Sequence, residues 1–253
     1  MFTKNLVTTR LRFNRSPWQR ELLYTETLKK CQFGFPGAER VIFRWGKFEF
    51  MPTSAEKLVW IDCEMTGLSL ENDALIEVAV LVTDSELNVL GDGVSVVIKP
   101  EPQALEQMGD FVRNMHINSG LLEELDGGMG MAEATAVVMD YIRAYAPEPK
   151  TALLAGNSVG TDKNFLARDM PEVIDHLHYR IVDVSTIKEL SRRWYPKAYY
   201  SAPAKDGNHR ALGDIKDSID ELRYYRAAVM VPAPGPVSDV AAGIAAEIKS
   251  NPS

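Results

Sequence analysis

Residues 58–68 read LVWIDCEMTGL, and this stretch decides how the rest of the chain is interpreted. Its short apolar run predicts a buried strand over residues 58–64. Alternate side chains of a strand point to the same face, so Asp62 and Glu64 lie side by side, about 7 Å apart along the chain. The opposite face is predicted to be buried and consists of Val59, Ile61 and Cys63. Paired carboxylates among apolar neighbours repel each other unless a cation lies between them, although a strand end with both acids facing water is the alternative.

The remaining elements are predicted from apolar spacing and from turn residues. Four further strands are expected, at 73–83, 89–99, 152–155 and 181–184, of which the first two form an antiparallel hairpin. Helices are expected at 105–115 and 131–145, from Asp162, from Ser185, and at 212–230. Strands that come first in a run and then alternate with helices predict an α/β, three-layer domain with a mixed central sheet flanked by helices.

Charge divides the 253-residue chain into unlike parts. Residues 1–50 hold ten basic and four acidic side chains, whereas the other 203 hold 18 and 31, a net charge of −13. We expect residues 1–55 to be a poorly ordered N-terminal extension. Three interpretations of this stretch compete: upstream sequence translated ahead of a true start at Met51, an organelle-targeting segment, and an appended functional arm. The first is favoured, and four glutamates weaken the targeting interpretation. Residues 56–230 are expected to form the catalytic domain and residues 231–253 a flexible tail with at most a weak helix.

Composition excludes several classes of protein. The longest apolar run of the central region, residues 78–82, is far shorter than the roughly 20 residues of a membrane span, so no membrane association is expected. Two cysteines are too few for a disulfide framework and fit a reducing cytoplasm. The overall charge of −7 argues against a protein that grips long nucleic acid through its phosphates. Nucleic-acid chemistry through metal ions stays open, because the ions bring positive charge.

Three further residues are candidates for chemistry. Asp162 follows the loop GNSVG at 156–160, although an acid in a first helical turn is often only a cap. His209 and Asp214 are five residues apart, or roughly 140° around a regular helix, so they cannot share one helix face. We therefore expect His209 in the loop or first turn before the helix, from which it can reach a site that Asp214 also reaches. A lone exposed histidine is the alternative.

Together these residues suggest metal-dependent hydrolysis. The four carboxylates Asp62, Glu64, Asp162 and Asp214 match the charge of two Mg²⁺ or Mn²⁺ ions, which prefer hard oxygen ligands. His209 has a side chain that titrates near neutrality and can take a proton from water. Such a set suits cleavage of a phosphodiester bond.

Three stretches resemble the DEDDh 3′-to-5′ exonuclease family, and within it the oligoribonuclease branch. They are residues 59–68, 156–162 and 209–215, which read VWIDCEMTGL, GNSVGTD and HRALGDI, with support from 179–186 and 188–194. The similarity spans about residues 56–230. It implies a ribonuclease H-like fold and the 3′-to-5′ degradation of short RNA, especially dinucleotides, to 5′-mononucleotides.

The resemblance also implies a role for individual residues. Metal binding falls on the four carboxylates named above, and the general base is His209. Base stacking falls on Leu68, Phe111 and His116, and the cap over the 5′ phosphate on Ser158, Arg180, Ser185 and Thr186. A tyrosine from the other subunit completes the family's site, which makes Tyr179 the candidate and implies a homodimer. Phe111 stands where the family usually has tryptophan, and its place on an apolar stripe leaves a core role as the alternative. Thr161 also departs from the family's more polar side chain.

Two other functions are compatible with these motifs. The first is a DEDDh exonuclease that acts on DNA or on tRNA 3′ ends. Such an enzyme would be expected to show basic clusters, and the acidic charge of the domain argues against it. The second is a non-catalytic RNA-binding module, which the presence of all four acids and His209 disfavours.

Overall fold

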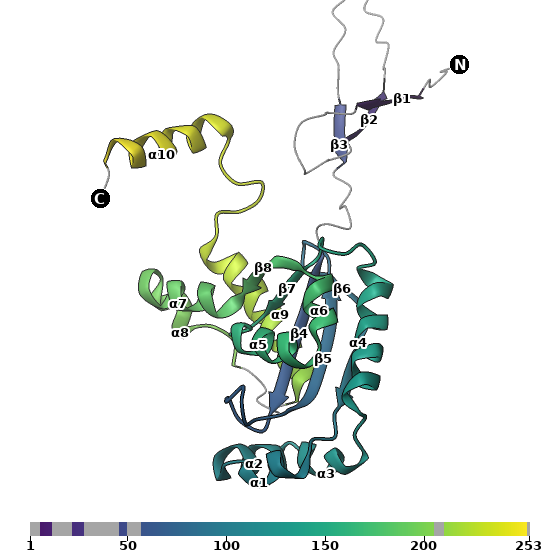
Figure 1. The fold of residues 1–253 in the computed structure, drawn as a ribbon. Coiled ribbons are helices and arrows are strands. Elements are labelled where there is room, and N and C mark those ends of the chain that lie inside the picture. The colour runs from purple at the N-terminus through teal and green to yellow at the C-terminus, as the bar shows by residue number, and fades with distance from the viewer. Residues whose placement is uncertain (1–5, 12–21, 28–45, 50–56, 205–209, 252–253) are drawn as a thin grey trace, which may run out of the picture. The chain divides into compact units, whose positions relative to one another are not determined.

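The computed structural model describes residues 6–11, 22–27, 46–49, 57–204 and 210–251, and it divides the chain into two compact units, Met1–Ala55 and Glu56–Ser253 (Figure 1). In the first unit the described residues form three antiparallel strands, β1 (Leu6–Leu11), β2 (Leu22–Thr27) and β3 (Gly46–Glu49). The sequence pattern predicts no strand in this unit. The low order expected for the rest of residues 1–55 falls outside the described residues.

The second unit is built on a five-stranded mixed sheet. Its strands are β4 (Leu58–Met65), β5 (Leu75–Thr83), β6 (Val89–Val97), β7 (Leu153–Gly156) and β8 (His178–Asp183). They are ordered β6-β5-β4-β7-β8, with β4, β5 and β6 antiparallel and β7 parallel to both β4 and β8. The predicted mixed sheet and the predicted hairpin are both confirmed.

Helices cover both faces of this sheet, which gives the three predicted layers (Figure 1). The helices are α1 (Pro102–Gln107), α2 (Asp110–Asn118), α3 (Leu121–Glu124), α4 (Met131–Tyr145), α5 (Gly160–Asp169), α6 (Pro171–His176), α7 (Val184–Trp194), α8 (Pro196–Tyr200), α9 (Ala211–Val229) and α10 (Ser238–Ser250), with a 3-10 turn at Leu125–Gly127. Apolar side chains of α4, α5 and α6 pack on one face, and those of α7 and α9 pack on the other. Among the described helices, none combines the length and the apolar composition that a bilayer crossing requires.

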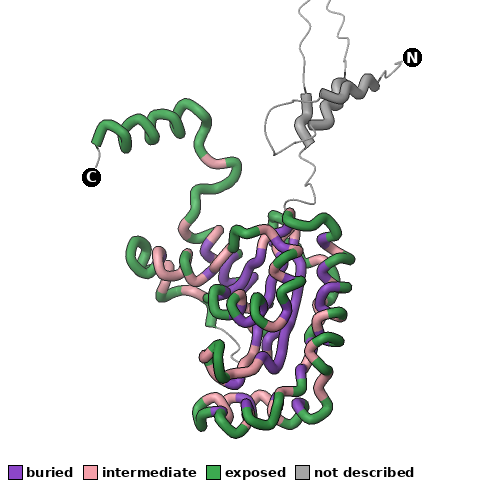
Figure 2. Tube along the Cα trace, viewed as in Figure 1, coloured by how far each residue is buried: buried purple, intermediate pink, exposed green. Residues whose placement is uncertain are grey.

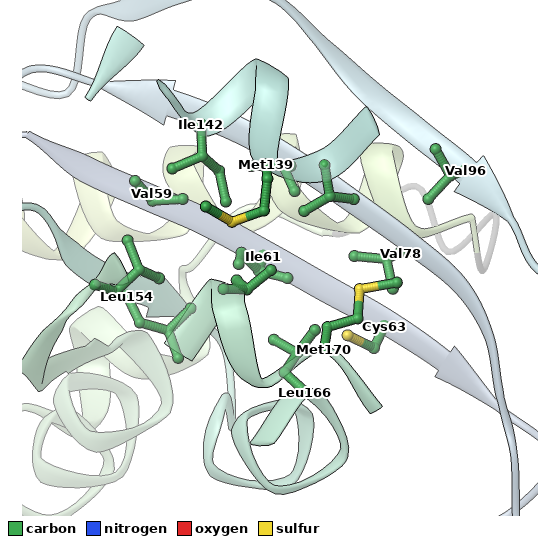
Figure 3. Packing of buried hydrophobic residues seen from close by; sticks show 14 of the residues in the cluster. Val59, Ile61, Cys63, Val78, Val96, Met139, Ile142, Leu154, Leu166 and Met170 are labelled. Atoms are coloured by element: carbon green, nitrogen blue, oxygen red, sulfur yellow. The ribbon is translucent and has the colours of Figure 1, made fainter. Parts of the chain in front are cut away.

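Strand β4 is the middle strand of the sheet, and Figure 2 shows that the buried residues gather in the sheet. Val59, Ile61 and Cys63 pack toward α4 and α5, which confirms the predicted buried face (Figure 3). Trp60 points the other way, into the cluster that includes α9. Since side chains alternate along a strand, the carboxylates of Asp62 and Glu64 share the face of Trp60 and meet α9.

Two local predictions needed correction. The helix expected at 105–115 is two helices, because Gly109 adopts an extended conformation and caps α2. The strand expected at 181–184 is β8, which begins earlier and ends at Asp183. Its first residue, His178, pairs with Leu153 of β7, and this pairing, rather than apolar content, sets the start of the strand. Within residues 231–253, where at most a weak helix is expected, the structure contains the exposed helix α10.

Candidate active site

Three of the predicted carboxylates meet at one point of the second unit. One carboxylate oxygen from each of Asp62, Glu64 and Asp214 lies within 4.8 Å of the other two. β4 supplies the first two and the first turn of α9 supplies the third. The strand alternation and the packing of α9 on that face of the sheet bring together residues about 150 positions apart.

Asp162 reaches the same strand from the other side. β7 runs parallel beside β4, so the loop after Gly156 and the first turn of α5 emerge near Asp62. The Oδ1 atom of Asp162 accepts a hydrogen bond of 3.0 Å from the backbone N–H of Cys63, the residue between Asp62 and Glu64. Asp162 is buried, and this bond fixes its carboxylate against β4.

Burial and neighbouring acids raise the pKa of two carboxyl groups in this region. Burial raises the pKa of Glu64 to about 8, with Asp214, Glu77 and Asp162 adding to the effect and Arg210 opposing it. Burial likewise raises the pKa of Asp162 to about 6, against the lowering effect of its hydrogen bonds. Three carboxylates around one point, among them Glu64 with its raised pKa, form a site that a divalent cation would stabilise, and oxygen donors suit Mg²⁺ or Mn²⁺.

The predicted general base, His209, lies outside the described residues. The described chain resumes at Arg210, which caps α9 with an extended backbone. The helix predicted at 212–230 is confirmed as α9, which runs from Ala211 to Val229.

The sequence analysis assigned no role to Glu77, Glu124 and Arg210. Glu77 is buried on β5, and Arg210 forms ion pairs with both glutamates. An acid inside the otherwise apolar strand LIEVAVLVT was the one signal available in the sequence. The pairing with Arg210, 133 residues further on, has no sequence pattern of its own.

Two residues of the predicted phosphate cap are connected through a third side chain. Asp183 Oδ1 accepts hydrogen bonds from the backbone N–H of Ser158 at 2.9 Å and from the hydroxyl of Ser185 at 2.6 Å. It also accepts from the N–H of Ser185, and so caps α7. Ser158 has a left-handed φ of 62°, which this bond helps to hold. The other two residues of the predicted cap, Arg180 and Thr186, are exposed, and both lie close to Asp183 in the sequence.

The predicted stacking residues differ in exposure. Leu68 and Phe111 are 76% and 83% exposed, so the alternative that Phe111 belongs to the core is wrong. His116 is fully buried on α2, where its Nε2 lies 2.9 Å from the carbonyl oxygen of Met65. Its Nδ1 lies 4.0 Å from Glu64 Oε2, so this ring stands directly beside the acidic cluster.

Tyr179 lies on β8, at the edge of the sheet, and is 73% exposed. Its ring contacts that of His178 at 4.4 Å between centroids, and the Arg180 guanidinium lies 5.6 Å from its centroid. The structure therefore presents Tyr179 and Arg180 together on an open edge.

Known proteins share both the sequence and the fold of this domain. Residues 59–222 match the family RNase_T, described as Exonuclease. The chain is 65% identical over 192 residues to an oligoribonuclease of Streptomyces coelicolor, which covers 76% of this chain and 96% of that protein. It is 53% identical over 198 residues to an oligoribonuclease of Mycobacterium leprae, over 78% of this chain and 92% of that protein.

Among solved structures, the zinc-bound complex of E. coli exonuclease I with single-stranded DNA is similar in fold. It matches with a TM-score of 0.52 at 14% identity, over 69% of this chain and 41% of that one. A product-bound structure of exonuclease I matches with a TM-score of 0.53 at 14% identity, over 68% of this chain and 43% of that one. This chain thus spans about two fifths of their length, and at this identity the likeness supports the ribonuclease H-like fold alone.

The sequence matches therefore decide the family, and the fold and the acidic cluster agree with them: the chain belongs to the DEDDh exonucleases, in the oligoribonuclease branch, and is a hydrolytic nuclease.

Proposed function

We propose that this chain is a 3′-to-5′ exoribonuclease that degrades short RNA, and dinucleotides above all, to 5′-mononucleotides. The observation that carries the proposal is the convergence of Asp62, Glu64 and Asp214 within 4.8 Å of one another at a largely buried point of an exonuclease domain. Relatives named oligoribonuclease, similar over nearly their whole length, support the substrate class.

Asp62, Glu64, Asp162 and Asp214 would hold two Mg²⁺ or Mn²⁺ ions. When bound, such ions lower the pKa of water and stabilise the charge that develops on the leaving oxygen. The protein's own part is to hold the four carboxylates in place, which the sheet, α5 and α9 do. In the sequence His209 precedes Arg210, the N-cap of α9, and we assign it the removal of a proton from the attacking water.

The substrate would be held by contacts at its two ends. Leu68 and Phe111, both exposed, offer surfaces on which bases stack without being identified, and each stacked base contributes about 1–3 kcal/mol. His116 completes the predicted stacking set, and its ring would have to leave its buried position to do so. At the other end, Ser158, Arg180, Ser185 and Thr186 would bind the 5′ phosphate. Such a cap blocks the path of a longer strand and so limits substrate length.

A homodimer completes the proposal, with Tyr179 contributed to the partner's site. β8 is an edge strand whose Tyr179 and Ile181 are exposed, and exposed apolar side chains on an edge strand favour association. Among the described residues, Cys63 carries a free, buried thiol, which fits the reducing cytoplasm in which we place the enzyme.

The polarity of degradation tests the proposal. A triribonucleotide labelled at its 3′ end should release a labelled mononucleotide first in Mg²⁺, and the same RNA labelled at its 5′ end should pass through a labelled dinucleotide. EDTA and the variant Asp214→Asn should both stop the reaction. Release of the 5′ label first, or cleavage that persists in EDTA, would reject the assignment.

The phosphate cap has a test of its own. Arg180→Ala should weaken binding of a 5′-phosphorylated dinucleotide while leaving Mn²⁺ affinity unchanged, because a guanidinium binds phosphate through two charged hydrogen bonds and is not one of the proposed metal ligands. Equal affinity of the parent enzyme for dinucleotides with and without the 5′ phosphate would show that no cap exists.

A further inference from the structure

The guanidinium of Arg210 joins two acidic side chains from distant parts of the second unit. Its Nη2 lies 3.1 Å from Glu77 Oε1 and its Nη1 lies 2.7 Å from Glu124 Oε1. Its Nε donates to both Glu77 oxygens at 3.3 Å, and Nη2 also donates to Glu124 Oε2 at 3.0 Å. We call these three residues the Arg210 bridge. A planar fork bound on two sides has one orientation, so the bridge fixes where Arg210 stands.

One end of the Arg210 bridge is anchored inside the sheet. Glu77 is 1% exposed, and in the β4–β5 pairing it lies directly opposite Glu64. Its Oε1 also accepts a hydrogen bond of 2.6 Å from the hydroxyl of Ser95 on β6. A buried carboxylate needs a charged partner, and Arg210 supplies it. The bridge therefore ends one strand away from the acidic cluster.

The other feature of Arg210 is its position at the start of α9. Its carbonyl oxygen accepts the backbone N–H of Asp214 at 3.1 Å, and the next residue, Ala211, donates its own N–H to Glu77 Oε2 at 3.4 Å. The first turn of α9 is therefore tied to β5 through both the side chain of Arg210 and the backbone. Asp214 projects from that turn into the acidic cluster, and His209 immediately precedes Arg210 in the chain.

We propose that the Arg210 bridge positions the start of α9, and that it thereby sets Asp214 relative to Asp62 and Glu64. This inference rests on the proposed function, because it assumes that the carboxylates hold metal. Arg210, Glu77 and Glu124 are positioning residues, since none of them contacts the reacting atoms in this account.

The test compares turnover of a 5′-phosphorylated diribonucleotide with Mn²⁺ affinity and thermal stability. Arg210→Lys keeps the charge but cannot reach both glutamates with a planar fork. Its kcat should fall by roughly 10- to 100-fold, the scale of an ångström-sized misplacement, while KM changes less than about threefold. Glu124→Gln, which loosens only the exposed side of the bridge, should show a smaller fall in kcat.

A double variant separates positioning from stability. Arg210→Met alone leaves the buried carboxylate of Glu77 without a charged partner, and it should lower the melting temperature. Adding Glu77→Gln removes that charge while keeping an acceptor for Ser95, so the melting temperature should recover but kcat should not. Arg226→Met is the matched control. Arg226 lies on the same helix, near its other end, and its ion pair with Glu86 does not involve the site, so its loss should leave kcat unchanged.

Two results would overturn the inference. One is a kcat of Arg210→Lys equal to that of the parent, and the other is recovery of both stability and kcat in the double variant, which would make the bridge structural only. Failure of the proposed function looks different, because the parent enzyme itself would then not cleave the dinucleotide.

Discussion

Asp162 is tied to Cys63: the backbone N–H of Cys63 donates a 3.0 Å hydrogen bond to Asp162 Oδ1. Cys63 is the residue between Asp62 and Glu64, so this bond places a fourth carboxylate against the strand that carries the first two. Asp162 belongs to a first helical turn, where an acid often serves only as a cap. Its buried bond to another element instead supports a role in the site.

Two substitutions at Asp162 should separate its charge from its hydrogen bond. Asp162→Asn keeps an acceptor for the Cys63 N–H, whereas Asp162→Ala does not. Both should lose roughly a thousandfold in turnover, which corresponds to the several kcal/mol that metal-held charge stabilisation supplies. Both variants should fold, because each relieves charge crowding. In EDTA the asparagine variant should have a higher melting temperature than the alanine variant, because it keeps the acceptor for the Cys63 N–H. Near-normal activity in either variant would show that Asp162 holds no metal.

The raised pKa of Glu64 predicts how the metal-free protein responds to pH. A carboxyl whose pKa rises from 4.5 to about 8 on folding contributes stability that is full below pH 4.5 and is lost as the pH rises through about 8. In EDTA, the free energy of unfolding should therefore fall between pH 5 and pH 8, by at most about 1.4 kcal/mol per pH unit from this group.

Glu64→Gln should remove that part of the pH dependence, while Glu106→Gln, an exposed control on α1, should retain it. Urea unfolding in EDTA at both pH values measures the difference. If Glu64→Gln and the parent lost stability in parallel, the charge on Glu64 would not be the cause.

The loop that carries Leu68 should be sensitive to a single methyl group. A Cβ added at Gly67 would lie 2.4 Å from Asp73 Oδ2, and Asp73 accepts hydrogen bonds from Thr66 and Ser69 that hold the loop. Gly67→Ala should cost about 1–3 kcal/mol in unfolding free energy, as overpacking does, and should raise KM for the dinucleotide. Gly243→Ala on α10 adds its methyl group in open space and serves as the control. Unchanged stability and KM for Gly67→Ala would argue against this role of the loop.

Asp183 should matter for the phosphate cap although it carries the wrong charge to bind phosphate. Asp183→Ala removes the cap of α7, which costs about 1–2 kcal/mol, and releases Ser158 from Ser185. The preference for a 5′-phosphorylated over an unphosphorylated dinucleotide should shrink. Asp183→Asn, an equally good helix cap, should restore stability and most of that preference. Full preference in the alanine variant would mean that Asp183 does not organise the cap.

The sequence allowed some features to be predicted and hid others for physical reasons. Alternation along β4 places Asp62 and Glu64 on one face, and that rule needs no tertiary information. The break at Gly109 and the early start of β8 depend on packing and on pairing with a neighbouring strand, which apolar spacing does not report. The Arg210–Glu124 pair joins residues 86 positions apart, and only the fold brings them together.

The most direct measurement compares hydrolysis of a 5′-phosphorylated diribonucleotide with that of a seven-residue RNA, in Mg²⁺ and with an EDTA control. The site described here predicts rapid conversion of the dinucleotide to mononucleotides, much slower cleavage of the longer strand, and no reaction in EDTA. Cleavage of the seven-residue RNA at an equal or higher rate would contradict the cap-limited site.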